Sequence, residues 1–306
     1  MSQQAPAPSR RSLLKGAALV GAGSVAFAAC SKSDRYDGRG VYSRRVERVQ
    51  LDPGHDSWGD SPYTDIELGP QNMTLPQQLN PAVTRVRVRS AHDGERIAFR
   101  LDWEDLDVND QTIRVDDYRD ACAVLLAPGD ADEAMRMMGT ATVPVTLLHW
   151  KADWERMVAK GDEGLDAAFP NRSVDTYPII WKTPADEVTI DSYVEAGATE
   201  WLPAIHVKNP VAGRTTRFTS VEKAIAYSFS TTTSAPTQDA RGRGRHSEDG
   251  WSVVLVKPLG AADDGEMDLK PGTVSTCAFA VWSGRRRDVG PRKCPATTVA
   301  ALELEG

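Results

Sequence analysis

Cysteine is scarce in this sequence, and the spacing of its four cysteines excludes several kinds of metal centre. They stand at Cys30, Cys122, Cys277 and Cys294. No Cys-x-x-Cys pair is present for an iron–sulfur cluster or a zinc knuckle, and no Cys-x-x-Cys-His is present to attach a c-type haem. Cys122 and Cys277 lie in apolar runs, so we predict that both are small, buried core residues.

The chain also lacks the features of three other classes of protein. Its formal net charge is −7, and no basic stripe is large enough to bind nucleic acid. The short run from Arg285 to Arg287 is predicted to be an exposed turn. The apolar run at residues 16–29 is too short to span a bilayer as a permanent helix. No nucleophile–base arrangement, phosphate-binding loop or metal-ligand spacing supports an enzyme that acts alone.

The N-terminus has the composition of an export signal. Residues 9–15 read Ser-Arg-Arg-Ser-Leu-Leu-Lys, which is a twin-arginine pattern, and a run of apolar and small residues follows. Residues 27–30, Phe-Ala-Ala-Cys, resemble a bacterial lipobox with Phe in place of the usual Leu. We predict that residues 1–29 are a signal and that Cys30 is the acylated first residue of a chain anchored at the periplasmic face. Ordinary signal cleavage near the same run is the alternative.

The rest of the chain has the pattern of a β protein. We predict a polar, lipid-anchored tether at residues 30–45 and one domain at residues 46–306. Residues 84–89 alternate strictly between polar and apolar side chains, and an Asp-Gly turn at residues 93–94 joins them to a second alternating run. The predicted strands are residues 45–51, 84–89, 96–102, 121–127, 143–150, 251–256, 273–282 and 297–304.

Helical signal is short by comparison. Asp153 can cap a helix at residues 154–160, and residues 221–227 are predicted to form a brief helical turn. Loops at residues 161–187 and 232–249 are predicted to lie at one rim. Many short strands separated by turn residues favour an all-β fold, specifically an antiparallel β-sandwich with a few short helices and long rim loops.

One stretch, residues 137–154, combines two methionines and a glycine with an apolar strand and a cluster of His149, Trp150, Lys151 and Trp154. A thioether beside aromatic and aliphatic side chains suits a non-covalently bound haem. A Met pair beside Trp is equally typical of ordinary core packing. The stretch alone leaves both interpretations open.

Several segments together resemble one protein family. These segments are Ser-Ala-His-Asp-Gly-Glu-Arg-Ile-Ala-Phe-Arg-Leu-Asp-Trp-Glu-Asp at 90–105, Arg-Asp-Ala-Cys-Ala-Val at 119–124, Met-Gly at 138–139 with Pro-Val at 144–145 and His-Trp-Lys-Ala at 149–152, Asp-Gly-Trp-Ser-Val-Val at 249–254, and Ala-Phe-Ala-Val-Trp-Ser-Gly at 278–284 with Arg-Lys at 292–293. They resemble the haem-binding gamma subunits of type II molybdenum enzymes of the dimethyl sulfoxide reductase superfamily. That group includes ethylbenzene dehydrogenase, dimethyl sulfide dehydrogenase, selenate and chlorate reductases and nitrite oxidoreductase.

The resemblance implies a β-sandwich that holds one non-covalent b-type haem between an axial Met and an axial Lys. The family's Met precedes a Gly and corresponds to Met138, and the family's Lys stands in an Arg-Lys pair and corresponds to Lys293. Met135 and Met137 are close enough in sequence to be alternatives to Met138. Cys294, directly after Lys293, departs from the small polar residue that the family pattern leads us to expect.

Three further residues are candidates for contact with the cofactor. Lys257 is a competing lysine that is expected to meet a haem propionate or a carboxylate. His149 is a competing iron ligand on general grounds, and a packed position beside the cofactor is the favoured role. Trp150 is expected to form, with Trp154, a supporting wall.

Two functions follow as hypotheses. In the first, the chain is a non-catalytic electron-transfer subunit, because an iron with two axial protein ligands has no open position for a substrate. It would relay electrons between an iron–sulfur beta subunit, bound to a molybdenum catalytic alpha subunit, and a soluble periplasmic carrier. In the second, it is a haem-free exported β-sandwich that binds a sugar or another small solute.

Overall fold

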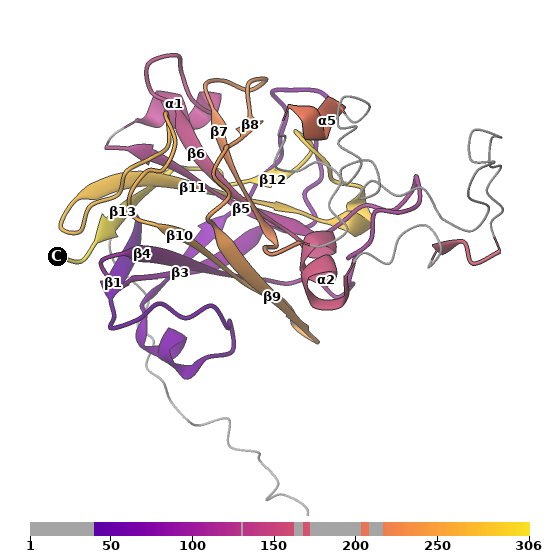
Figure 1. The fold of residues 1–306 in the computed structure, drawn as a ribbon, viewed down its shortest axis with the longest axis horizontal. Helices are drawn as coiled ribbons and strands as arrows, with labels where there is room; N and C mark the ends of the chain where they lie inside the picture. The colour runs from indigo at the N-terminus through magenta and orange to yellow at the C-terminus, as the bar shows by residue number, and fades with distance from the viewer. Residues whose placement is uncertain (1–39, 130, 162–167, 172–202, 208–216) are drawn as a thin grey trace, which may run out of the picture. The chain divides into compact units, whose positions relative to one another are not determined.

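The computed structural model describes residues 40–129, 131–161, 168–171, 203–207 and 217–306 (Figure 1). These residues all belong to one unit, Ser33–Gly306. The predicted signal at residues 1–29, Cys30 and most of the predicted loop at 161–187 lie outside the described residues. Among the helices that the structure describes, none has the length and apolar character needed to cross a membrane.

Strands make up most of the regular structure, which confirms the predicted all-β fold class. The helical elements are the 3-10 turn η1 (Asp56–Asp60), α1 (Asp132–Met137), α2 (Ala152–Lys160), α5 (Pro203–His206) and the 3-10 turn η4 (Gly284–Arg286). The strands are β1 (Gly40–Arg45), β2 (Tyr63–Glu67), β3 (Arg85–His92), β4 (Arg96–Trp103), β5 (Ala121–Pro128), β6 (Val145–Lys151), β7 (Val221–Ala226), β8 (Thr233–Ser234), β9 (Arg241–Ser247), β10 (Gly250–Pro258), β11 (Val274–Trp282), β12 (Cys294–Pro295) and β13 (Ala300–Leu304).

Within the described residues, the strands join in the order β8-β7-β6-β5-β11-β13-β1-β3-β4-β10-β9, with β12 beside β11 and β2 beside β3. All pairs are antiparallel except those of β1, which runs parallel to both β13 and β3. β1 lies between the two halves of the path, so it joins the layer that contains β5, β6 and β11 to the layer that contains β3, β4 and β10.

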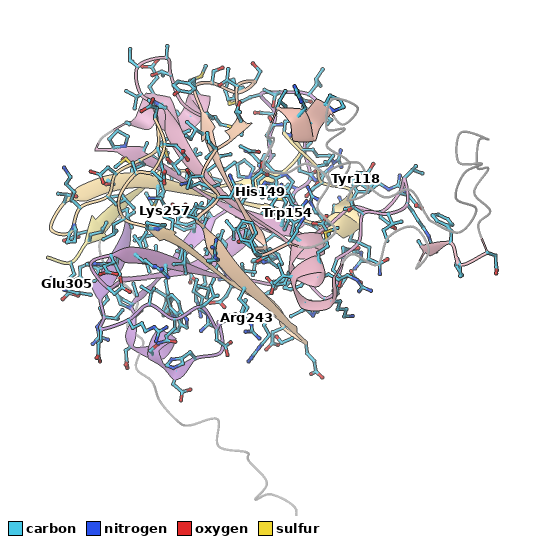
Figure 2. The ribbon with its side chains drawn as sticks, in the orientation of Figure 1. Tyr118, His149, Trp154, Arg243, Lys257 and Glu305 are labelled. Carbon is cyan, nitrogen blue, oxygen red and sulfur yellow. The ribbon has the colours of Figure 1, made fainter. Side chains whose placement is uncertain are left out.

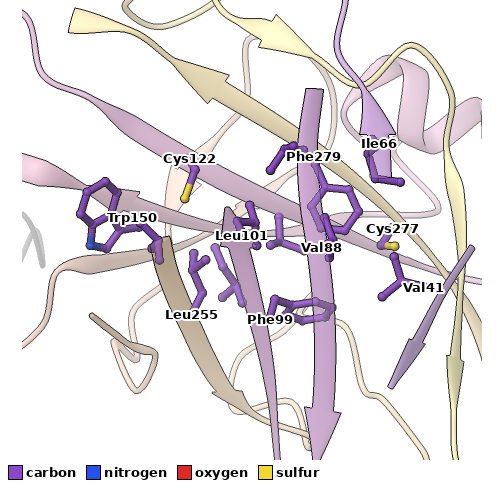
Figure 3. Packing of buried hydrophobic residues seen from close by; sticks show 14 of the residues in the cluster. Val41, Ile66, Val88, Phe99, Leu101, Cys122, Trp150, Leu255, Cys277 and Phe279 are labelled. Atoms are coloured by element: carbon purple, nitrogen blue, oxygen red, sulfur yellow. The ribbon is translucent and has the colours of Figure 1, made fainter. Parts of the chain in front are cut away.

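The strands of the two layers pack their inward side chains against each other. Val88, Leu101 and Leu255 of one layer share a buried cluster with Trp150 and Phe279 of the other (Figure 3). The strict alternation in β3 causes this directly, because every second side chain of a strand points to the same face. Each fully buried large aliphatic or aromatic side chain stabilises the fold by roughly 1.5–3 kcal/mol. Cys122 and Cys277 are completely buried in this cluster, as predicted.

The hairpin between β3 and β4 forms as predicted. Gly94 has φ +89°, a conformation that side-chain-bearing residues rarely adopt. Asp93 stabilises the turn, because its Oδ1 accepts hydrogen bonds from the backbone N–H groups of Glu95 and Arg96. Such side-chain bonds to a turn backbone are typical of Asp.

Five predictions about the elements need correction. Gly40–Arg45 form a strand in the middle of the sheet and are not part of a tether. The strand predicted at residues 45–51 is wrong, because residues 46–51 form no strand. Residues 221–226 form β7 and not a helical turn, and residues 232–249 contain β8 and β9 and are not one long loop. The helix predicted at residues 154–160 begins earlier, at Ala152, so that Asp153 lies in its first turn.

Candidate functional site

The outward face of β5, β6, β7 and β11 is apolar. It forms a second cluster, separate from the core between the layers, in which alanine dominates. Its buried members are Ala121, Ala123, Leu125, Ala127, Ala134, Met135, Val145, Leu147, Ala224, Ala226, Ala280 and Trp282. We call the sheet part of this cluster the alanine face. In register, Ala123 of β5 lies between His149 of β6 and Ala280 of β11, so short methyl groups cover the centre of the face.

Helix α1 crosses this face and ends in a tight turn at Met138 and Gly139. Met138 adopts the left-handed conformation, φ 54° and ψ 48°, and Gly139 follows with φ 97°. The Gly139 N–H donates to the carbonyl of Ala134, as is common where a helix ends. A Cβ at Gly139 would stand 2.2 Å from the carbonyl oxygen of Ala226 in β7. Only glycine therefore allows the end of α1 to lie this close to the sheet.

The loop between β11 and β12 brings Lys293 to the same place. β12 pairs with β11 through Cys294 and Pro295, which fixes the position of the preceding lysine. The Nε1 of Trp282 donates to the carbonyl of Gly290 at 3.0 Å and holds the loop from inside. As a result, Lys293 Nζ lies 3.7 Å from Met138 Sδ, although the two residues are 155 positions apart in the chain. The two predicted axial ligands are neighbours in space.

Lys293 lies in an environment that favours a neutral amine. Burial lowers its pKa from 10.5 to about 8. No carboxylate pairs with it among the residues that the structure describes; its Nζ lies 5.5 Å from the centre of the Trp282 ring. An uncompensated ammonium is costly away from water, so the amine gives up its proton more readily than an exposed lysine does. The free amine that results has the lone pair that a metal ion needs.

His149 lies further along the alanine face. Its ring stacks on Trp282, with the ring centroids 4.7 Å apart and the planes at 30°. Burial, together with the nearby cations Lys151, Arg119 and Lys293, holds the pKa of His149 well below its ordinary value. The ring is therefore neutral. Its Nε2 is buried and has no hydrogen-bond partner in the described part of the chain.

Two other candidates do not reach this face. Trp150 follows His149 in β6 and so points to the opposite side, where it packs on Trp103 and Trp251 and donates to Glu155 at 2.9 Å. Lys257 also points into the space between the layers, where its Nζ lies 3.3 Å from Glu266 Oε1. Both are core residues and not part of the surface that carries Met138 and Lys293.

The remaining methionines and Trp154 have separate positions. Met135 is buried under α1 as part of the apolar cluster, while Met137 is exposed. Neither has a contact with Lys293 like that of Met138. Trp154 lies in the first turn of α2, and the Nζ of Lys151 lies 4.0 Å from the centre of its ring. Figure 2 marks His149, Trp154 and Lys257.

Trp282 is the site residue that the sequence analysis missed. Its indole contacts His149 on one side and Lys293 on another, and its N–H holds the loop that carries Lys293. The available signal was the alternation of β11, in which Ala278, Ala280 and Trp282 share one face. The informative feature was the large Trp282, which follows the small Ala278 and Ala280 on that face.

The donor set of this site fits a haem. A thioether and a neutral amine are soft and intermediate donors that bind first-row transition metals. Nitrogen and sulfur ligands stand about 2.0–2.3 Å from such an ion, taking zinc as a guide. The sulfur and nitrogen atoms, at 3.7 Å, need to separate by less than about 1 Å to hold an ion between them. No group of three or more His, Cys, Asp or Glu residues suitable for a metal ion occurs in the described ranges.

Comparison with known proteins gives a family and two relatives. Residues 55–293 match the family model described as ethylbenzene dehydrogenase. The chain is 21% identical to the chlorate reductase gamma subunit of Ideonella dechloratans over 287 residues, which cover 90% of this chain and 91% of that protein. It is 26% identical over 137 residues, 44% of this chain, to a respiratory nitrate reductase haem subunit of Haloferax mediterranei, and the match spans 50% of that relative.

Solved structures with a similar arrangement are distant in sequence. A family 9 carbohydrate-binding module from Caldicellulosiruptor kristjanssonii, solved with glucose, is 9% identical. The match covers 87% of this chain and 95% of the module, with a TM-score of 0.37.

Proposed function

We propose that this chain, which belongs to the ethylbenzene dehydrogenase family, is an electron-transfer subunit that binds one b-type haem through Met138 and Lys293. One observation carries the proposal, namely the 3.7 Å contact between Met138 Sδ and Lys293 Nζ beside the alanine face. The family match covers both residues, since it runs from residue 55 to residue 293. The curated relatives, a gamma subunit and a haem subunit of two reductases, support the same conclusion.

The two side chains decide what such a site does. A haem, when bound, supplies one-electron transfer between its ferric and ferrous states. Met138 contributes a neutral thioether, which stabilises the reduced state, and Lys293 contributes a neutral amine after it loses its proton. Two neutral ligands leave the charge of the oxidised state less compensated, so we expect a high reduction potential. A haem held by both Met138 and Lys293 would have no position left for a substrate, so the site would transfer electrons and would not turn over a substrate.

The partners and the cellular location extend this proposal. Because one relative is named as a gamma subunit, we infer that the chain joins a molybdenum catalytic alpha subunit through an iron–sulfur beta subunit. We further infer that it exchanges electrons with a soluble periplasmic carrier. The twin-arginine pattern supports export of a folded protein, and the lipobox-like residues support a lipid anchor at Cys30. A Cys30→Ser variant that stays in the membrane fraction would exclude that anchor.

Haem reconstitution tests the proposal. The purified protein is expected to take up one haem and to give a low-spin spectrum with sharp reduced bands. Met138→Ala and Lys293→Ala are each expected to give a high-spin spectrum and a shifted potential, because each leaves one axial position open. Met137→Ala is the matched control, since Met137 is an exposed neighbour. A protein that takes up no haem, or two ligand variants with unchanged spectra, would overturn the proposal.

A further inference from the structure

We propose that His149 is a hydrogen-bond donor to a carboxylate of the haem bound at this site, and so forms the polar end of the alanine face. This inference rests on the proposed function, because the carboxylate belongs to the cofactor. It assigns to His149 a positioning role in place of iron ligation. The argument rests on an unpartnered nitrogen, the charges around it and its place relative to Lys293.

The unpartnered atom is the Nε2 of His149. Within the described residues it is buried and has no hydrogen-bond partner. A buried polar group without a partner costs roughly 1–3 kcal/mol, so it is retained in stable proteins mainly where a ligand or another group completes it. The ring itself is held firmly, since it stacks on Trp282 at 4.7 Å. The position is therefore preorganised for a partner that comes from outside the described chain.

The charges around His149 favour an anionic partner. Lys151, Arg119 and Lys293 are the cations that lower its pKa. Two carboxylates lie among them, but both are already engaged. Glu222 pairs with Lys151 and also accepts from Ser234, and Asp153 pairs with Arg119 at 2.6 Å. An incoming carboxylate thus meets a neutral imidazole near Lys151 and Arg119, which remain charged when Lys293 binds as a neutral amine. An incoming cation finds no free acid at Glu222 or Asp153.

The position of the ring matches a group that carries both a metal and carboxylates. Trp282 contacts both His149 and Lys293, so one indole separates the donor from the proposed iron ligand. A haem carries two propionate carboxylates at one edge of a flat ring. Burying a carboxylate without hydrogen bonds is costly, so the edge that enters the protein needs donors. A neutral imidazole provides one N–H and needs no counter-ion of its own.

The experiment compares haem with its dimethyl ester, in which both carboxylates are blocked. His149→Phe keeps an aromatic ring against Trp282 but removes the N–H, and His149→Gln restores an N–H donor. His92→Phe is the matched control, because His92 of β3 is also buried with ring nitrogens that lack partners in the described residues, but it does not lie on the alanine face. Affinity is measured by titration and checked by competition with apomyoglobin, and the reduced spectrum reports the axial ligands.

We expect His149→Phe to bind haem about ten- to a hundredfold more weakly than the wild type, as the loss of one hydrogen bond to a charged group predicts. It should bind the dimethyl ester with unchanged affinity and keep a low-spin spectrum with both ligands. His149→Gln should recover most of the loss. If His149→Phe does not fold, the comparison of His149→Leu and His149→Gln gives the same reading.

Three outcomes would overturn the inference. Equal losses for haem and the ester would mean that His149 only packs, and unchanged haem affinity would mean that it has no contact. A high-spin spectrum in His149→Phe would make it an iron ligand. A wild-type protein that binds neither compound would refute the proposed function itself, which separates that failure from the other three.

Discussion

Lys223 and Lys257 between the layers and the part-buried Lys293 on the outer side of the sheet have different surroundings. Between the layers, the side chains of Lys223 and Lys257 are fully buried and share Glu266, at 2.7 Å and 3.3 Å. Lys223 also pairs with Asp239 at 2.8 Å. Lys293 lies beside the alanine face. It has no carboxylate partner within the described residues and contacts Met138 and Trp282 instead.

The difference determines what each lysine can do. Burial acts to lower the pKa of Lys223, but hydrogen bonds and charge from Asp239 and Glu266 outweigh it, so the pKa is raised. Burial alone acts on Lys293 and lowers its pKa to about 8. Lys223, which has several acids around it, is thus a structural cation, whereas at Lys257 burial outweighs the one shared acid and lowers the pKa. Lys293, which has no acid beside it within the described residues, is a source of a neutral amine, which is the form that binds a metal ion.

The largest expected effect comes from removing the shared acid of the interior group. Glu266→Ala leaves Lys223 and Lys257 without their common partner and removes the acceptor for the backbone N–H of Ala262. We expect the free energy of unfolding to fall by about 3–5 kcal/mol, the range for breaking a buried ion pair. Urea denaturation of the haem-free protein measures it.

The matched control is Asp268→Ala, which removes the acid of an exposed pair with Lys270. Exposed pairs contribute about 0–1 kcal/mol, so this variant should stay close to the wild type. Similar losses in the two variants would mean that the interior cluster does not stabilise the fold more than a surface pair does.

The next prediction is a change in the free energy of unfolding that has opposite signs for substitutions of Lys293 and of Lys257. Lys293→Met replaces a buried amine that has no acid partner by an apolar side chain of similar length. The haem-free protein should become more stable by about 1–3 kcal/mol, because replacing an unfavourable buried charge by a well-packed apolar group is stabilising. Lys257→Met should lose about 1–2 kcal/mol, because it leaves Glu266 with one fewer donor. Thermal unfolding of the two variants, measured without haem, compares the signs directly. Destabilisation of both would contradict the distinction.

Local sequence patterns were sufficient for much of the fold but not for all of it. Alternation predicted β3 and β4 within a few residues, and apolar runs predicted β5 and β11, which are buried on both faces. β7 was mistaken for helix because Lys223 occupies an inward position, and its acid partners are remote in sequence. β9 was missed because Gly242 and Gly244 stand at its inward positions, where the Val221 side chain and the Trp150 ring leave no space for a Cβ.

The site was predictable only in part for a similar reason. Met138 and Lys293 were predicted as ligands through a family resemblance, and nothing in their immediate neighbours separates Lys293 from Lys257. What separates them is the distant Glu266, which only the folded chain brings to Lys257. Likewise, Trp150 and His149 are adjacent in sequence but lie on opposite faces of β6. The local sequence of the strand does not decide which of these faces packs inward.

The smallest expected effect is a difference in pH dependence, and it tests the lysine comparison most directly. The pKa of Lys293 is about 8 in the folded chain, against an ordinary value of 10.5. Between these values the unfolded chain holds a proton that the folded chain does not. The free energy of unfolding of the haem-free protein therefore rises with pH from about 8 toward 10.5, by about 1.4 kcal/mol per pH unit at most. Lys293→Met should lack this contribution. Parallel pH profiles of the wild type and the variant from pH 7 to pH 9.5, followed by urea denaturation, would show instead that Lys293 keeps its proton in the folded chain and is not prepared to act as a ligand.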